Sequence, residues 1–75
     1  MNIILYNEGK YEKEFYYEVK GSFESEFDHI SEYIDNILMD HLHEEVQLYF
    51  DPHPGEADLA MHLAQAYGAK LKNNS

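Results

Sequence analysis

Apolar and polar residues change their spacing several times along the chain, and each spacing predicts a different element. Residues 2–6, NIILY, are a short continuous apolar run, which is typical of a central strand with neighbours on both edges. Residues 11–20, YEKEFYYEVK, alternate between apolar and polar positions, as in a strand with one buried face. The intervening residues 7–10 contain Gly9, which suits a tight hairpin turn. We therefore expect the first two strands to pair.

The longest amphipathic stretch lies in residues 23–42 and predicts the first helix. Its apolar residues follow three- and four-residue spacing, namely Phe23, Phe27, Ile30, Ile34, Ile37, Leu38 and Leu42. Ser22 or Ser25 is placed to accept a hydrogen bond from the first backbone amides, so either residue can cap this helix.

Residues 45–50, EVQLYF, alternate again and predict a third strand, with Val46, Leu48 and Phe50 facing inward. The following DPHPG is expected to be a loop, because each proline disfavours helix in the residue before it. Pro54 suits the first position of a second helix, which Gly68 would close as a C-terminal cap. Residues 70–75, KLKNNS, are expected to form a flexible tail.

This order of elements, β-β-α-β-α, predicts a single α+β domain over residues 1–69. If the first strand is central, the sheet has three strands in the order 2-1-3 and both helices cover one face, which makes a two-layer sandwich. The other face then presents Tyr6, Tyr16 and Tyr49 among acidic residues. Such a face is either an interaction surface or a consequence of tyrosine being a good strand former, and the sequence leaves both interpretations open.

The distribution of charge restricts the partners that the chain can bind. The net charge is −10, and residues 21–69 contain eleven acidic residues but no lysine or arginine. Affinity for nucleic acid comes largely from cations that displace counterions from phosphate, so we expect no direct binding to nucleic acid or to an anionic membrane. A basic protein is the natural partner. The chain lacks cysteine, a signal-like leader and any run of roughly 20 apolar residues, so we expect a cytoplasmic protein.

Signatures of catalysis and of cofactor binding are missing from the sequence. There is no G-x-G-x-x-G, no P-loop, no H-E-x-x-H and no cysteine nucleophile, so we expect a protein that is not an enzyme and binds no cofactor. The stretch DHLHEE, with His53 and His62, contains residue types that can bind metal. His41 and His43 lie two residues apart near the expected helix end, a spacing that argues against a preformed metal site.

The acidic residues of the first helix form the candidate partner-binding site. In ESEFDHISEYID, residues 24–35, four carboxylates recur at spacings of four, four and three on the side opposite the apolar stripe, and they step along the helix by about 5–6 Å. No cation relieves their mutual repulsion, whereas an ordinary exposed helix mixes both signs. A row of this kind can occupy a groove built for phosphates, or it can be a solvated face that serves solubility. The candidate residues are Glu24, Asp28, Glu32, Asp35, Asp40, Glu44 and Glu45.

A short, cysteine-free and strongly acidic chain with this carboxylate row resembles the small phage-encoded inhibitors of bacterial defence, including anti-CRISPR and other nucleic-acid-mimic proteins. The resemblance is one of class, and it implies a stoichiometric inhibitor that occupies the basic nucleic-acid channel of an effector. Lys10, Lys13 and Lys20 depart from a uniformly acidic surface, so any mimicry belongs to the helical half. The alternative is a protein–protein interaction module or a homodimer that uses the face of Tyr6, Tyr16 and Tyr49.

Overall fold

The computed structural model of the protein describes residues 1–7, 11–21, 23–41 and 45–72, except for the side chains of residues 11, 23 and 24. The fold is α+β, with two helices and a mixed four-stranded sheet. Along the chain the elements are β1 (Asn2–Asn7), β2 (Tyr11–Tyr16), α1 (Phe23–Asp40), β3 (Gln47–Asp51), α2 (Ala57–Tyr67) and β4 (Lys70–Leu71).

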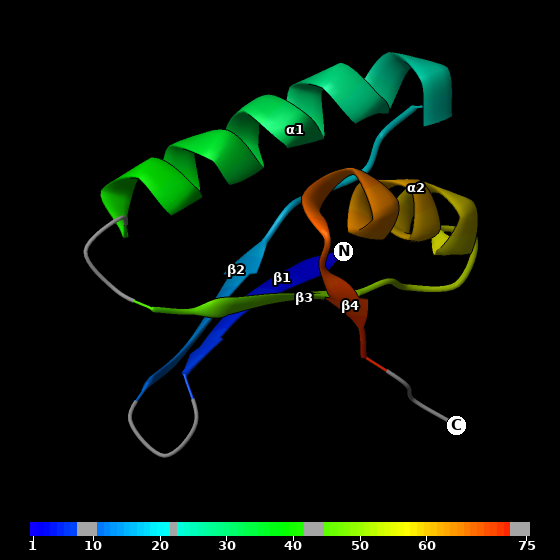
Figure 1. The fold of residues 1–75 in the computed structure, drawn as a ribbon. Helices are drawn as coiled ribbons and strands as arrows, with labels where there is room; N and C mark the ends of the chain where they lie inside the picture. The colour runs from blue at the N-terminus through cyan, green and yellow to red at the C-terminus, as the bar shows by residue number, and fades with distance from the viewer. Residues whose placement is uncertain (8–10, 22, 42–44, 73–75) are drawn as a thin grey trace.

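The strands lie in the order β2-β1-β3-β4, so the continuous apolar run of β1 is central, as the sequence predicts (Figure 1). Strand β1 is antiparallel to both β2 and β3, while β4 runs parallel to β3. Ile3 of β1 pairs with Phe15 of β2 and with Phe50 of β3, and paired residues point to the same face of a sheet. This register places the three side chains on one face.

The hydrophobic core lies between that face and the two helices. Ile3 and Phe50 are fully buried and belong to one cluster with Ile30 and Ile34 of α1. Met1 and, from α2, Leu59, Ala60 and Leu63 complete the cluster. Figure 1 shows both helices on the same side of the sheet. The predicted apolar stripe of the first helix is therefore the side of α1 that packs on the core.

Strand β4 corrects the prediction of a three-stranded sheet and a tail that begins at residue 70. Gly68 adopts the left-handed conformation, with φ 62°, and ends α2 as predicted. The Ala69 amide donates to the Ala64 carbonyl at 2.8 Å, which turns the chain back toward β3. The Lys72 amide then donates to the Phe50 carbonyl at 2.8 Å. Part of the edge of β3 thereby gains hydrogen-bond partners that it would otherwise lack.

Two element boundaries in the first half of the chain differ from those predicted. Strand β2 ends at Tyr16 rather than at residue 20, yet Tyr17 and Val19 still pack against the core. The Met1 amino group donates to the Tyr17 carbonyl at 2.9 Å, which ties the start of the chain to the end of β2. Helix α1 begins at Phe23, so Ser25 lies inside the helix and does not cap it. Ser22, the other predicted cap, lies outside the described residues, as does Leu42.

The second half of the chain also begins its elements later than predicted. Strand β3 starts at Gln47 instead of residue 45, and α2 starts at Ala57 instead of Pro54. Pro54 lies in a turn in which Glu56 accepts a hydrogen bond from the His53 amide at 2.9 Å. The same Glu56 carboxylate forms an ion pair with the Met1 amino group at 3.2 Å, so the turn before α2 is fastened to the start of the chain.

Candidate functional site

The solvent-facing side of α1 carries three exposed carboxylates, which we call the α1 acidic row: Asp28, Glu32 and Asp35. They lie opposite the buried Ile30 and Ile34, because residues four and seven apart return to the same side of a helix. The rise between successive carboxylates is about 6 Å and then about 4.5 Å. The ion pair of Met1 with Glu56 and that of the exposed Lys20 with Glu18 do not involve the row.

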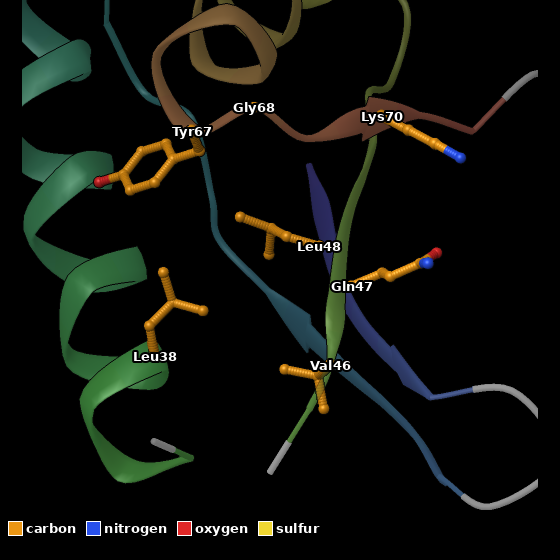
Figure 2. A pocket seen from close by; sticks show the side chains of 7 residues that line it. All are labelled: Leu38, Val46, Gln47, Leu48, Tyr67, Gly68 and Lys70. Atoms are coloured by element: carbon orange, nitrogen blue, oxygen red, sulfur yellow. The ribbon is translucent and has the colours of Figure 1, made fainter. Parts of the chain in front are cut away.

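One member of the row is held in place by the second helix. The Tyr67 hydroxyl lies 2.7 Å from Asp35 Oδ1 and 3.0 Å from the Ser31 carbonyl oxygen, so α2 is bonded to α1 at this point. Figure 2 shows the hydroxyl directed toward α1. Burial and the bond to Asp35 raise the pKa of Tyr67 to about 12, because both favour the neutral phenol over the phenolate. The Tyr67 hydroxyl therefore helps to fix the orientation of the Asp35 carboxylate.

Of the remaining candidate residues, the two whose side chains are described, Asp40 and Glu45, do not extend the row. Asp40 is exposed at the end of α1, but it lies five residues after Asp35 and hence about 140° around the helix from it. Glu45 is exposed in the segment that precedes β3. The backbone of Glu24 is in the first turn of α1, whereas Glu44 lies outside the described residues. Of the five predicted carboxylates whose side chains are described, the structure thus brings three together on one exposed face.

The face of the sheet opposite the core, which we call the open sheet face, contains the predicted tyrosines. The rings of Tyr6 and Tyr49 meet edge to face with centroids 6.0 Å apart, and Ile4 beneath them is only 7% exposed. These three residues, with Glu12 and Lys72, line a hollow of about 260 Å³. Tyr16 is 57% exposed, and its ring lies 5.7 Å from that of His53. Aromatic side chains with polar neighbours are typical of interaction surfaces.

Two lysines on the open sheet face are absent from the sequence prediction. Lys70 pairs with Tyr49 across β3 and β4, and the Lys72 side chain reaches the hollow beside Tyr6. Both lysines belong to the segment predicted as a tail. The alternation of lysine, leucine and lysine after Gly68 is the signal in the sequence, although three residues are too few to predict a strand.

A second hollow, of about 380 Å³, lies between α1, β3 and the end of α2 (Figure 2). Leu38, Leu48 and Tyr67 give it an apolar wall, while the polar ends of Gln47 and Lys70 point away from it in Figure 2. Val46, which also lines the hollow, lies immediately before β3. The described residues of the lining include no pair of acidic and basic groups that could catalyse a reaction.

The described histidines do not assemble into a metal centre. In the part of the chain that the structure describes, no three His, Asp or Glu side chains lie close enough together to hold a metal ion. His41 follows the end of α1, and His43 lies outside the described residues. None of the described helices is both long enough and apolar enough to cross a membrane.

Comparisons with protein-family models, with curated proteins and with solved structures find no match to this chain. Any functional conclusion must therefore come from its own surfaces.

Proposed function

We propose that the protein is a small, non-catalytic inhibitor whose α1 acidic row binds a basic, nucleic-acid-binding surface of a partner protein. The observation that carries the proposal is the placement of Asp28, Glu32 and Asp35 on one exposed face of a helix without lysine or arginine. A partner built to bind phosphates offers cations at spacings of several ångströms, and a line of carboxylates can satisfy them in place of nucleic acid.

The scaffold favours this role because it fixes the carboxylates on a regular element. We regard the fold as a two-layer sandwich in which the sheet supports the helices and leaves the outer side of α1 to the partner. The bond from Tyr67 restrains Asp35, which lowers the conformational entropy that binding must overcome. A strongly negative surface also speeds the approach of a basic partner, and this effect weakens as salt is added.

The likeness to phage-encoded inhibitors of bacterial defence extends the proposal to a class of partner. On this proposal the protein acts in the cytoplasm of a bacterial host, and its target is an effector nuclease or another DNA- or RNA-binding protein with a basic channel. It acts stoichiometrically and binds no nucleic acid itself, because its net charge of −10 repels phosphate.

The test compares two variants with the same change in charge. One replaces the row with amides, Asp28→Asn, Glu32→Gln and Asp35→Asn, and the matched control replaces three exposed carboxylates of the β2 segment, Glu12→Gln, Glu14→Gln and Glu18→Gln. The immobilised wild-type protein captures basic proteins from a bacterial lysate, and duplex DNA is then added as a competitor. Affinities of both variants are measured by calorimetry with the captured partner that DNA displaces.

The row variant should lose at least about tenfold in affinity, or roughly 1.4 kcal/mol, whereas the control should lose less than about threefold. The wild-type complex should also weaken as the ionic strength rises toward about 0.15 M, where the screening length is about 8 Å. An equal loss of affinity in the row variant and the control variant would show that binding depends on net charge and not on the α1 acidic row. If DNA fails to displace any captured partner from the immobilised protein, the proposal that the target binds nucleic acid is wrong.

A further inference from the structure

A single row of paired residues crosses the whole open sheet face. Glu14 of β2 pairs with Ile4 of β1, Ile4 pairs with Tyr49 of β3, and Tyr49 pairs with Lys70 of β4. The row therefore reads acid, aliphatic, aromatic and cation from one edge of the sheet to the other. It spans three inter-strand spacings, or about 14 Å.

The rest of the face repeats this polarity. The edge at β2 also carries the exposed Glu12, and the edge at β4 also carries the exposed Lys72. Tyr6, Tyr49 and the hollow above Ile4 lie between the two edges. Within the described residues, neither Glu14 nor Lys70 forms an ion pair. Two uncompensated charges of opposite sign thus flank an apolar centre.

This arrangement is complementary to itself under one particular symmetry. Consider two copies stacked with their open sheet faces together, related by a two-fold axis that runs between the two sheets, parallel to the strands and over the line between β1 and β3. Rotation about this axis places the β2 edge of one copy over the β4 edge of the other, and it keeps each residue at its level along the strands. It therefore sets Glu14 of one copy opposite Lys70 of the other and Ile4 opposite Tyr49. An axis perpendicular to the strands would instead set β2 against β2, where acidic residues face one another. The two-fold interface of a homodimer requires complementarity of this isologous kind.

We infer that the open sheet face binds a second copy of this chain, face to face, about a two-fold axis parallel to the strands. Sheets pack about 10 Å apart, a distance that the tyrosine side chains can fill from both sides and that the long Lys70 side chain can cross to reach Glu14 of the second copy. The acidic row of α1 does not oppose this contact directly, because it lies beyond the core from the open sheet face.

The dimer is expected to be weak because the face is small. Four strands about 4.8 Å apart and five residues of about 3.3 Å rise outline roughly 300 Å² of sheet. A standard interface takes about 800 Å² of accessible surface from each partner. We therefore expect dissociation in the range of about 10–100 µM, with repulsion between the two net charges weakening the dimer further at low salt.

Charge reversal across the row tests the proposal by sedimentation velocity from about 10 µM to 1 mM. E14K and K70E should each weaken dimerisation at least about tenfold, because each variant sets like charges opposite one another. The double variant E14K/K70E should dimerise within about threefold of wild type, since both pairs are again of opposite sign. An equimolar mixture of the two single variants should form a heterodimer more tightly than either variant dimerises alone.

The matched control is E32K, which changes the net charge as E14K does but lies on the α1 acidic row. It should dimerise at least as strongly as wild type, and circular dichroism should show that every variant is folded. E14Q and K70Q, which remove one charge without reversing it, should each weaken the dimer about threefold.

Three results would overturn the proposal. The first is a wild-type protein that stays monomeric to about 1 mM, which would leave the face to another partner or to solvent. The second is an E14K variant that dimerises as strongly as E32K, because net charge alone would then explain the association. The third is a mixture of single variants that stays monomeric.

Discussion

The hydroxyl of Tyr67 offers the sharpest test of how the two helices are held together. It bonds to the Asp35 carboxylate at 2.7 Å and to the Ser31 carbonyl at 3.0 Å. Tyr67→Phe removes this oxygen and keeps the ring, which packs edge to face on Phe50 with centroids 6.5 Å apart. The substitution therefore measures the hydroxyl separately from hydrophobic packing.

The expected loss of stability is about 1 kcal/mol. A bond to a charged group contributes roughly 1.5–3 kcal/mol when it is shielded from water. Because Asp35 is exposed, the ordinary range of about 0.5–1.5 kcal/mol, centred near about 1 kcal/mol, applies instead. The Ser31 carbonyl adds little to the loss, because an interior helix carbonyl keeps its bond to the amide four residues later. For a domain of this size, about 1 kcal/mol lowers the melting temperature by roughly 4–8 °C.

The effect of Tyr67 should depend on pH in the alkaline range. Its pKa in the fold is about 12, above the ordinary 10.0, so the folded protein holds the phenolic proton more tightly than the unfolded chain does. The resulting stabilisation is complete below about pH 10 and is lost as the pH rises through about 12. Tyr17, whose pKa is raised by burial and by its bond to Glu26, is present in both proteins and cancels in the comparison.

Urea unfolding followed by circular dichroism gives the free energy of unfolding of both proteins at about pH 7 and at steps between about pH 9 and 12. The advantage of wild type over Tyr67→Phe should narrow as the pH rises. Ultraviolet absorbance of the folded proteins should show one fewer tyrosine ionising near pH 12 in the variant. A difference below about 0.3 kcal/mol at pH 7, or one that stays constant up to pH 12, would refute this account of the helix contact.

Three further substitutions have defined expectations. Phe50→Ala empties a fully buried site in the core and should lower the free energy of unfolding, measured with urea, by about 3–5 kcal/mol, which is a large part of the stability of a domain this small. Gly68→Ala should lower the free energy of unfolding by about 1 kcal/mol, and Gly68→Asn should lower it by less. The loss arises from the backbone φ of 62°, because nothing lies within 4 Å of the added carbon and a clash is therefore excluded. Replacing Asp28 and Glu32 with their amides should raise the melting temperature slightly at low salt, because it removes i,i+4 repulsion of a few tenths of a kcal/mol. A clear fall in the melting temperature would contradict this expectation.

The elements that sequence reasoning predicts well are those with a long periodic pattern. The stripe that contains Ile30 and Ile34 repeats over five turns, and it correctly identifies the buried side of α1. The apolar run of β1 correctly predicts its central position. Both patterns report how a segment meets the core, and this information is local to the segment.

The features that sequence reasoning missed depend on contacts between distant segments. Strand β4 has only two residues, and it forms because Gly68 turns the chain toward an edge of β3 that lies beside the end of α2. The bond from Tyr67 to Asp35 joins residues 32 positions apart, so no short-range pattern could reveal it. The exposure of the α1 acidic row follows from helical spacing, whereas the polarity of the open sheet face does not, because its cationic edge exists only once β4 has formed.

The two proposed surfaces lie on opposite sides of one core, and this arrangement has a consequence for the strength of inhibition. A dimer formed through the open sheet face leaves both α1 acidic rows on its outer sides, facing away from each other. Such a dimer can engage two copies of a basic partner, or two basic sites on one assembly, and its second binding event is then intramolecular. The charge-reversed single variants E14K and K70E should therefore keep the affinity of one row for one partner molecule but lose avidity toward a partner immobilised at high density. The amide variant of the row should lose both, so the two surfaces can be assigned separately even though one molecule carries them.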